Sequence, residues 1–202
     1  MSTSLLDITI VSNFDAAEAL RAKDAASDAL GLQSVYIGQE VEDPSQGYCV
    51  LQWGSLSARD AFLRSAAYET YARHLTVAHG PFVAYLSEAN SAAYATILAA
   101  PVQKIGFLVA RTDLGRERVR GIMDFARAGR EERAEKHEIM GEIITAAVDD
   151  EDCSVVLDGW ESVEKHRAYA ARGVNTSAMS EVIHTLDWFS SRHVLSCAES
   201  MP

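Results

Sequence analysis

YCVLQWGS at residues 48–55 and VVLDGWES at residues 155–162 share one pattern. Each is a short run typical of a β-strand that reaches Trp-x-Ser and then turns polar. The two serines, Ser55 and Ser162, are placed as helix N-caps, because a hydroxyl there accepts a hydrogen bond from an unpaired N–H of the first turn. An aromatic residue, Phe62 or Tyr169, follows at the same offset from each tryptophan. The pattern therefore predicts two copies of one structural unit.

The segments around this pattern also correspond between the halves. The remaining strands are expected at 7–11, 33–40 and 81–87, and at 104–109, 142–148 and 185–190. The helices are expected at 15–30 and 56–78, and at 113–128 and 163–172, with a further helical stretch at 176–183. The charged stretch 127–138, extra in the second half, predicts a solvated helix extension.

Both halves read β-α-β-β-α-β, the order of the ferredoxin-like split unit. One face of such a sheet stays apolar and must be covered, and two copies in one chain can cover each other. The predicted fold class is therefore α+β, with two ferredoxin-like units, residues 1–98 and 99–202, packed sheet to sheet as a pseudo-dimeric α+β barrel.

Composition excludes several classes of protein. The 202 residues are 48% hydrophobic and 23% charged, which is typical of a packed globular chain. The net charge of −11 argues against nucleic acid and anionic membranes as partners. The start of the chain has no basic or long apolar segment of a secretory signal, and the run 92–102 is too short to span a bilayer. Three cysteines without metal-type spacing predict reduced thiols, no metal site and a cytoplasmic location.

The Trp-x-Ser strand end, the helix with Phe62, the run Ser65-Ala66-Ala67-Tyr68 and the histidine that follows resemble the antibiotic-biosynthesis-monooxygenase (ABM) group of dimeric α+β barrels. In that group two single-unit chains usually pair, and each unit has a pocket between its sheet and its helices. The resemblance therefore implies that this chain is a fused pair. The second half matches less well, because residues 172–175 replace the Ser-x-x-aromatic run.

The resemblance implies three chemistries: cofactor-free oxidation of aromatic polyketides with O2, haem degradation by an Asn–Trp–His set, and cyclisation by a His/Tyr pair. All three need an apolar pocket and a group that titrates near neutral pH, which histidine supplies best. The haem set is poorly matched. Phe62 and Tyr169 stand at the position of its tryptophan, Ala72 stands near the position of its iron-ligating histidine, and Asn13 follows the first strand instead of starting it.

Candidate site residues follow from the histidines and aromatic rings. The expected catalytic residues are His74, His79, Tyr68 and His184, and the expected substrate-binding residues are Tyr36, Trp53, Phe62, Tyr85, Tyr169 and Trp188. A histidine near a helix C-terminus can instead bond a free carbonyl, so a purely structural role stays open for His74 and His79. His166 lies between Lys165 and Arg167, which favours a solvated face.

The predicted function is that of a small ABM-type enzyme, with cofactor-independent oxygenation or cyclisation of an apolar, aromatic or polyketide-like substrate. The first half keeps more of the pattern, so we expect the working site there. Two alternatives stay open: a non-catalytic tandem barrel that binds a hydrophobic small molecule, and a haem-binding or haem-degrading protein. An apolar small molecule is the expected partner, and a homodimer of the whole chain stays open.

Overall fold

Strand β3 (Gln46–Trp53) ends at the first tryptophan and β7 (Cys153–Trp160) ends at the second, as the two patterns predict. The computed structural model describes residues 4–128, 139–148, 150–171 and 182–197. The chain divides into a first unit, Met1–Ser91 with Val194–Pro202, and a second unit, Ala92–His193. This division falls inside α4 (Glu88–Leu98), a few residues before the expected boundary, and gives the end of the last strand to the first unit.

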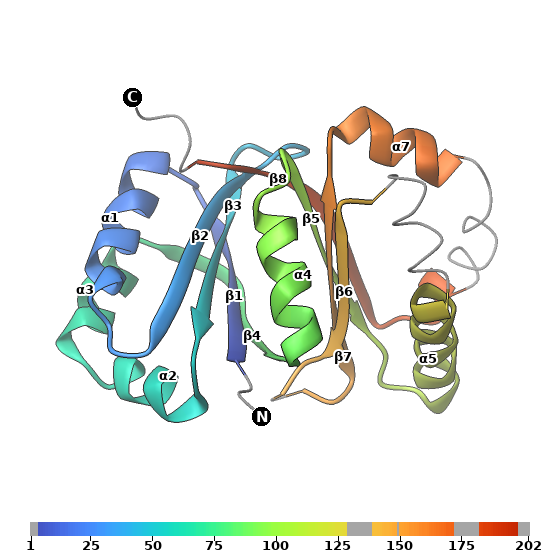
Figure 1. Ribbon diagram of the computed structural model, residues 1–202, viewed down its shortest axis with the longest axis horizontal. Helices are drawn as coiled ribbons and strands as arrows, with labels where there is room; N and C mark the ends of the chain where they lie inside the picture. The colour runs from blue at the N-terminus through green and yellow to red at the C-terminus, as the bar shows by residue number, and fades with distance from the viewer. Residues whose placement is uncertain (1–3, 129–138, 149, 172–181, 198–202) are drawn as a thin grey trace. The chain divides into compact units, whose positions relative to one another are not determined.

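The first unit has the predicted ferredoxin-like order. Its sheet runs β4-β1-β3-β2, and neighbouring strands are antiparallel. The other strands are β1 (Ser4–Ser12), β2 (Leu32–Glu40) and β4 (Thr76–Leu86). The helices α1 (Ala16–Ser27), α2 (Leu56–Leu63) and α3 (Ala66–Arg73) lie on one face of this sheet (Figure 1). Residues Val194–Ser196 of β8 pair with the outer edge of β2.

The single helix predicted over 56–78 is wrong, because the chain forms two helices and then a strand. Ser55 caps α2 as expected, with Ala58 N donating to its Oγ at 3.2 Å. Ser65 adopts an extended backbone and caps α3, with Tyr68 N donating to its Oγ at 3.2 Å. From Thr76 onward the chain pairs with β1 as β4. A second N-cap and the sheet edge together outweigh the helical periodicity of this segment.

The second unit repeats the strand order of the first. Its sheet runs β8-β5-β7-β6, with β5 (Val102–Val109), β6 (Gly141–Ala146) and β8 (Trp188–Ser196). Helices α5 (Asp113–Ala128) and α7 (Val163–Ala171) lie on one face (Figure 1). The α+β class and the ferredoxin-like order are thus confirmed. The expected helix extension beyond residue 128, and most of the expected helix at 176–183, lie outside the described residues.

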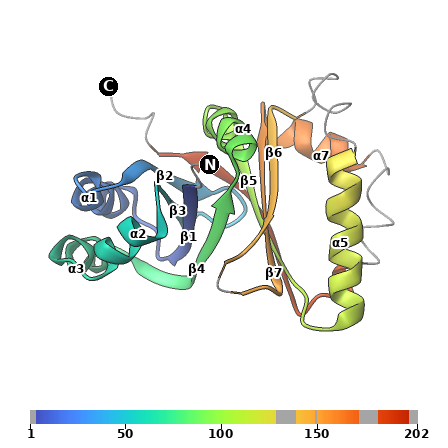
Figure 2. The same ribbon diagram turned by 60° about the horizontal axis from the view of Figure 1, so that its bottom comes forward.

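Helix α4 covers the opposite face of the second sheet from α5 (Figure 2). Two glycines that face each other across β6 and β7, Gly141 and Gly159, permit its close approach. A Cβ on Gly159 would lie 3.0 Å from the Cβ of Ala100 and 3.1 Å from the Cα of Ile97. Gln103 Nε2 donates to the Ile97 carbonyl at 3.2 Å and so caps the end of the helix. None of the helices in the described ranges is long and apolar enough to cross a membrane.

The glycine contact gives a stability test. We expect Gly159→Ala to destabilise the protein by about 1–3 kcal/mol, because the added methyl group meets the α4 backbone. Gly121→Ala is the matched control: a Cβ there meets nothing within 4 Å, and the residue is exposed inside α5. It should stabilise the protein by about 0.5–1 kcal/mol. Urea unfolding followed by circular dichroism measures both. Equal stability of Gly159→Ala and wild type would contradict the packing.

Candidate active site

The strand registers show which residues of the two units are equivalent. Trp53 lies opposite Leu5, and Trp160 lies opposite Val102. Both tryptophans are fully buried, Trp53 on the face of its sheet that α2 covers and Trp160 on the face that α7 covers. Because side chains alternate along a strand, every second residue counted from these pairs shares that face.

The two positions that lie two residues from these pairs carry different residues in the two units. On the first strand Asp7 corresponds to Lys104, and on the tryptophan strand Leu51 corresponds to Asp158. The sixth residue after each tryptophan, on the following helix, is Arg59 in the first unit and His166 in the second. The two units thus share a backbone plan but carry different chemistry on the same face.

In the first unit a buried ion pair occupies this face. Arg59 Nε donates to Asp7 Oδ2 at 2.7 Å, and the two side chains are 9% and 7% exposed. Burial of two charges costs free energy, which their attraction and hydrogen bonding offset only while both partners are present. Arg59 is therefore held in an ion pair with Asp7.

Aromatic rings fill the neighbouring space between β3 and the helices α2 and α3. Phe62 packs on Trp53 with ring centroids 5.1 Å apart, and on Tyr68 and Tyr71 at 5.6 and 5.8 Å. Phe62 and Tyr71 are buried and Tyr68 is half-buried. The structure thus brings together three of the expected site residues, Tyr68, Trp53 and Phe62, as a packed aromatic cluster.

Among the other expected site residues of the first half, His74, His79 and Tyr36 have other surroundings, whereas Tyr85 pairs with Leu5 and so shares the face of Trp53. His74 Nδ1 contacts Glu18 Oε2 of α1 at 2.7 Å, at the C-terminal end of α3. His79 is exposed on β4, and Tyr85 of the same strand is 44% exposed. Tyr36 pairs with Val50, an odd number of residues from Trp53, so it faces the other side of the sheet.

The cysteines are held as neutral thiols. Burial raises the pKa of Cys49 to about 12, with a smaller electrostatic contribution from Cys197. Burial also raises the pKa of Cys153 to about 12. Tyr71, which hydrogen-bonds Cys49, has its pKa raised well above the ordinary value, again chiefly by burial. Burial thus disfavours the thiolate, which is the nucleophilic form of a cysteine.

In the second unit the same face carries two histidines in direct contact. His166 Nδ1 lies 2.7 Å from His193 Nε2 of β8. His193 is 7% exposed, whereas His166 is half-buried. The ring of His166 lies 4.8 Å from that of Trp160, which also packs on Tyr169 at 5.4 Å.

The expectation that His166 faces solvent is wrong, and the start of α7 explains why. Ser162 caps this helix, with Lys165 N donating to its Oγ at 3.2 Å. Val163, in the first turn, is buried. A residue three positions further on lies on the same face, so His166 turns inward while Lys165 points to solvent and pairs with Glu161.

A carboxylate stands near the histidine pair at the first turn of α7. The pKa of Glu164 is lowered, first by a hydrogen bond from its own backbone N–H and then by one from the Ser162 side chain. Electrostatic attraction to Arg167 and His193 acts in the same direction. The negative charge of Glu164 therefore attracts His193 of the histidine pair.

Lys104 and Asp158 add an ion pair on the same face of this sheet. Lys104 Nζ donates to Asp158 Oδ2 at 2.8 Å, and Asp158 is 4% exposed. The other carboxylate oxygen, Oδ1, is buried and has no hydrogen-bond partner in the part of the chain that the structure describes. This residue was not among the expected site residues.

Two expected residues of the second half lie elsewhere. His184 is exposed in the turn before β8. Trp188 stacks on Phe107 at 5.8 Å. Phe107 pairs with Val155, an odd number of residues from Trp160, so this stack lies on the opposite face from the histidine pair.

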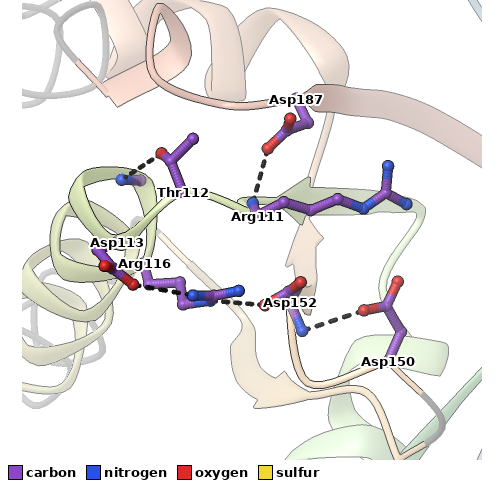
Figure 3. A network of polar contacts seen from close by, with 8 residues as sticks. Arg111, Thr112, Asp113, Arg116, Asp150, Asp152 and Asp187 are labelled. Atoms are coloured by element: carbon purple, nitrogen blue, oxygen red, sulfur yellow. Dashed lines mark hydrogen bonds and ion pairs between the residues drawn. The ribbon is translucent and has the colours of Figure 1, made fainter.

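A polar network at the start of α5 has a structural role (Figure 3). Arg116 Nε donates to Asp152 Oδ1 at 2.7 Å, and its Nη1 donates to Asp113 Oδ1 at 3.0 Å. The backbone N–H of Arg111 donates to Asp187 Oδ2 at 2.6 Å. The hydrogen bond from Arg116 is the main reason that the pKa of Asp152 is lowered. Across the described ranges, no group of three or more His, Cys, Asp or Glu residues could hold a metal ion.

The buried ion pair of the first unit can be tested by separating its partners. Arg59→Met removes the guanidinium that pairs with the buried Asp7 carboxylate, so we expect a loss of about 3–5 kcal/mol in unfolding free energy. The double variant Asp7→Leu/Arg59→Met should recover most of this loss, because it removes both charges. Arg73→Met, which breaks an exposed pair with Glu69, should change stability by less than about 0.5 kcal/mol. A double variant as unstable as Arg59→Met would contradict the ion pair.

Thiol reactivity tests the burial of the cysteines. Burial raises the pKa of Cys197 as well, but this thiol is only half-buried, whereas Cys49 and Cys153 are buried and have pKa values raised to about 12. In the folded protein at pH 8 we therefore expect iodoacetamide to modify Cys197 well before Cys49 and Cys153. Peptide mass spectrometry over a time course measures the order. In urea all three should react at similar rates. Modification of Cys49 as fast as Cys197 in the native protein would contradict the prediction.

Comparison with known proteins identifies the fold. No protein-family model matches the sequence, and no curated protein matches it. An anthrone oxidase-like protein of known structure is similar, with a TM-score of 0.62 and 10% identity, over 99% of this chain and 95% of that one. A mutant chlorite dismutase from Candidatus Nitrospira defluvii is similar with a TM-score of 0.58 and 12% identity, over 96% and 90%.

A third similar structure is a ferredoxin-fold protein from Listeria monocytogenes that is related to antibiotic biosynthesis monooxygenases. It matches with a TM-score of 0.59 and 10% identity, over 97% of this chain and 95% of that one. At such identities the likeness establishes the fold. The chain therefore has, over nearly its whole length, the ferredoxin-like fold of proteins related to the antibiotic biosynthesis monooxygenases.

Proposed function

We propose that this protein is an ABM-type enzyme that oxygenates an apolar aromatic compound with O2, without a cofactor, at a site in the second unit. The observation that carries the proposal is the 2.7 Å contact between His166 Nδ1 and His193 Nε2. It places a titratable pair, one member buried and one half-buried, against the rings of Trp160 and Tyr169.

The histidine pair supports general-base chemistry. At this distance one imidazole donates its N–H and the other accepts it. We assign His193 as the acceptor, and in that tautomer the proton of His166 stays on Nδ1 and its Nε2 carries the basic lone pair. A base held in one tautomer by a buried neighbour is a recurring arrangement in catalysis. In the proposed enzyme we therefore give His193 the role of positioning residue and His166 the role of base.

The proposed reaction needs only this base, the substrate and O2. His166 takes a proton from an acidic C–H of the substrate, and the electron pair left on carbon forms a bond to O2. The resulting peroxide anion takes the proton back from His166, and loss of water leaves a ketone. For anthrone, one O2 is consumed and one anthraquinone and one water are formed. The likeness to an anthrone oxidase-like protein makes anthrone a suitable first probe.

The first unit is the weaker candidate, although the sequence pattern favours it. There Arg59, at the position of His166, is paired with Asp7. The rings beside it pack on one another around Phe62. We therefore assign the first unit a structural role in the proposed enzyme.

Haem chemistry fits the described residues poorly. In the first unit Ala72 stands near the position of the iron-ligating histidine in the resemblance, and His74 is held by Glu18. In the second unit His166 and His193 are bonded to each other. We therefore derive no step through haem. Titration with haemin tests this alternative, and a shifted Soret band with saturable binding would favour it.

Oxygen uptake with anthrone near neutral pH tests the proposed function. We expect the wild-type protein to accelerate O2 consumption and the appearance of anthraquinone. His166→Asn should lower the rate about 100-fold or more, because it removes the base. His193→Asn should also lower the rate, and should shift its pH dependence because the tautomer of His166 is no longer held.

Lys165→Gln is the matched control, since it lies beside His166 but is exposed. It should keep wild-type activity, and circular dichroism should show that every variant is folded. Activity that survives in His166→Asn and is lost in His184→Asn would move the site to the residue predicted from the sequence. Binding of anthrone without O2 uptake would favour the non-catalytic alternative.

A further inference from the structure

The contact between His166 and His193 limits how many protons the two rings can bind. His166 Nδ1 lies 2.7 Å from His193 Nε2, so one nitrogen donates a hydrogen bond and the other must offer a lone pair. A protonated imidazole carries an N–H on both of its nitrogens. If both rings were protonated, two N–H groups would face each other at this distance. The contact therefore tolerates one added proton but not two.

The register of β8 against β5 shows what lies beside His193. These two strands are neighbours in the sheet. Just before β8 begins, Asp187 N donates to the Val109 carbonyl at 2.9 Å. Further along, a Cβ on Gly106 would lie 3.8 Å from the Cβ of Ser191. The residue number falls on β5 as it rises on β8, so the strands are antiparallel, and Gly106 and Ser191 are neighbours on one face.

The next neighbours on that face are Lys104 and His193. They stand two residues from Gly106 and from Ser191, in the same direction along the antiparallel pair, and the side-chain period of a strand is two residues. The Cβ atoms of residues in such positions lie about 4.5–5.5 Å apart. Lys104 is therefore a cation next to the histidine pair. On its other side it donates to Asp158 Oδ2 at 2.8 Å, so the charge of that carboxylate is already balanced.

Two further charged groups near the pair come from the first turns of α7. Glu164 attracts His193, and Arg167 in turn attracts Glu164. Both of these helix residues are exposed, so solvent screens their charges. Arg192, which precedes His193 on β8, is exposed and points to the other face. One added proton on the pair is thus attracted by Glu164, whereas a second one is opposed by the first and by Lys104.

The equivalent contact of the first unit uses no imidazole. Arg59 of α2 stands at the position of His166 of α7, and its Nε donates to Asp7 at 2.7 Å. A guanidinium stays charged at every pH at which proteins are ordinarily folded. Helices α2 and α7 therefore have equivalent places in the two units but are held to their sheets by chemically different contacts.

We propose that the His166–His193 contact is a proton-sensitive contact, which holds α7 on β8 near neutral pH and releases it in acid. An ordinary imidazole takes up a proton at a pH of about 6.5. Below that pH the separated rings bind two protons and the rings in contact bind one. The state that binds more protons gains as the pH falls, by up to about tenfold per pH unit. This inference goes beyond the proposed function, because it needs the contact but no reaction.

Hydrogen exchange followed by mass spectrometry tests the inference on the whole unmodified chain. The rates are divided by the intrinsic rates at each pH, which gives protection factors. Between pH 7.5 and pH 5.0 we expect the protection of α7 to fall about tenfold or more. Helix α2, which is held through Arg59, is the internal control and should change by less than about threefold. An equal change in the two helices would overturn the inference.

Two variants remove the titration but keep a hydrogen bond. His193→Gln places an amide where Nε2 stands, and His166→Asn places one where Nδ1 stands. An amide donates or accepts without taking up a proton, so the protection of α7 should vary by less than about threefold over the same pH range. His184→Gln removes an exposed imidazole of the same unit and should keep the wild-type fall. A fall that survives in both variants of the pair would overturn the inference.

The comparison of α7 with α2 needs no substitution, so it decides the question even if a variant does not fold. Oxygen uptake with anthrone separates this inference from the proposed function. Loss of α7 protection in acid, in a protein that takes up no O2, would support the inference and refute the proposed oxygenation. Oxygen uptake by a protein whose α7 protection stays constant from pH 7.5 to pH 5.0 would refute the inference alone.

Discussion

The site depends on one constraint, the antiparallel strand pairing of each unit. This pairing sets each buried tryptophan opposite a residue of the unit's first strand. Once Trp53 lies opposite Leu5, and Trp160 opposite Val102, the two-residue period of the strands decides which side chains face the helices. A shift by one residue would turn Asp7, Lys104 and Asp158 to the other face. The serine two residues after each tryptophan then starts a helix, and so decides the helical phase of Arg59 and His166.

Much of the fold could be predicted because its signals are local. Alternating strands, the Trp-x-Ser turn and the capping serines each lie within a few residues, and they occur twice. The break between α2 and α3 was missed because helical periodicity continues across it while Ser65 offers a competing cap. The start of β4 was missed for a different reason: residues from Thr76 onward are ordered by hydrogen bonds to β1, a distant segment.

The site could be predicted only in part, because its contacts join distant residues. The cluster of Trp53, Phe62 and Tyr68 follows from offsets along one segment. The pairing of His166 with His193 does not, since 27 residues separate them and part of the intervening chain lies outside the described residues. The matching offsets of Arg59 and His166 from their tryptophans were the signal available in the sequence. The charged neighbours Lys165 and Arg167 made His166 look solvent-exposed. Residues next to each other on a helix point in different directions, so they do not show which way His166 faces unless the helical phase is known.

The discontinuous make-up of the first unit has a consequence for biosynthesis. Its sheet is completed at the β2 edge by Val194–Ser196, which are made after the whole of the second unit. While the ribosome is still translating the second unit, the outer edge of β2 therefore lacks its final strand. An unpaired strand edge invites pairing with other chains. For this protein the hazard of misassembly is concentrated in the interval between release of the first four strands and arrival of the last one.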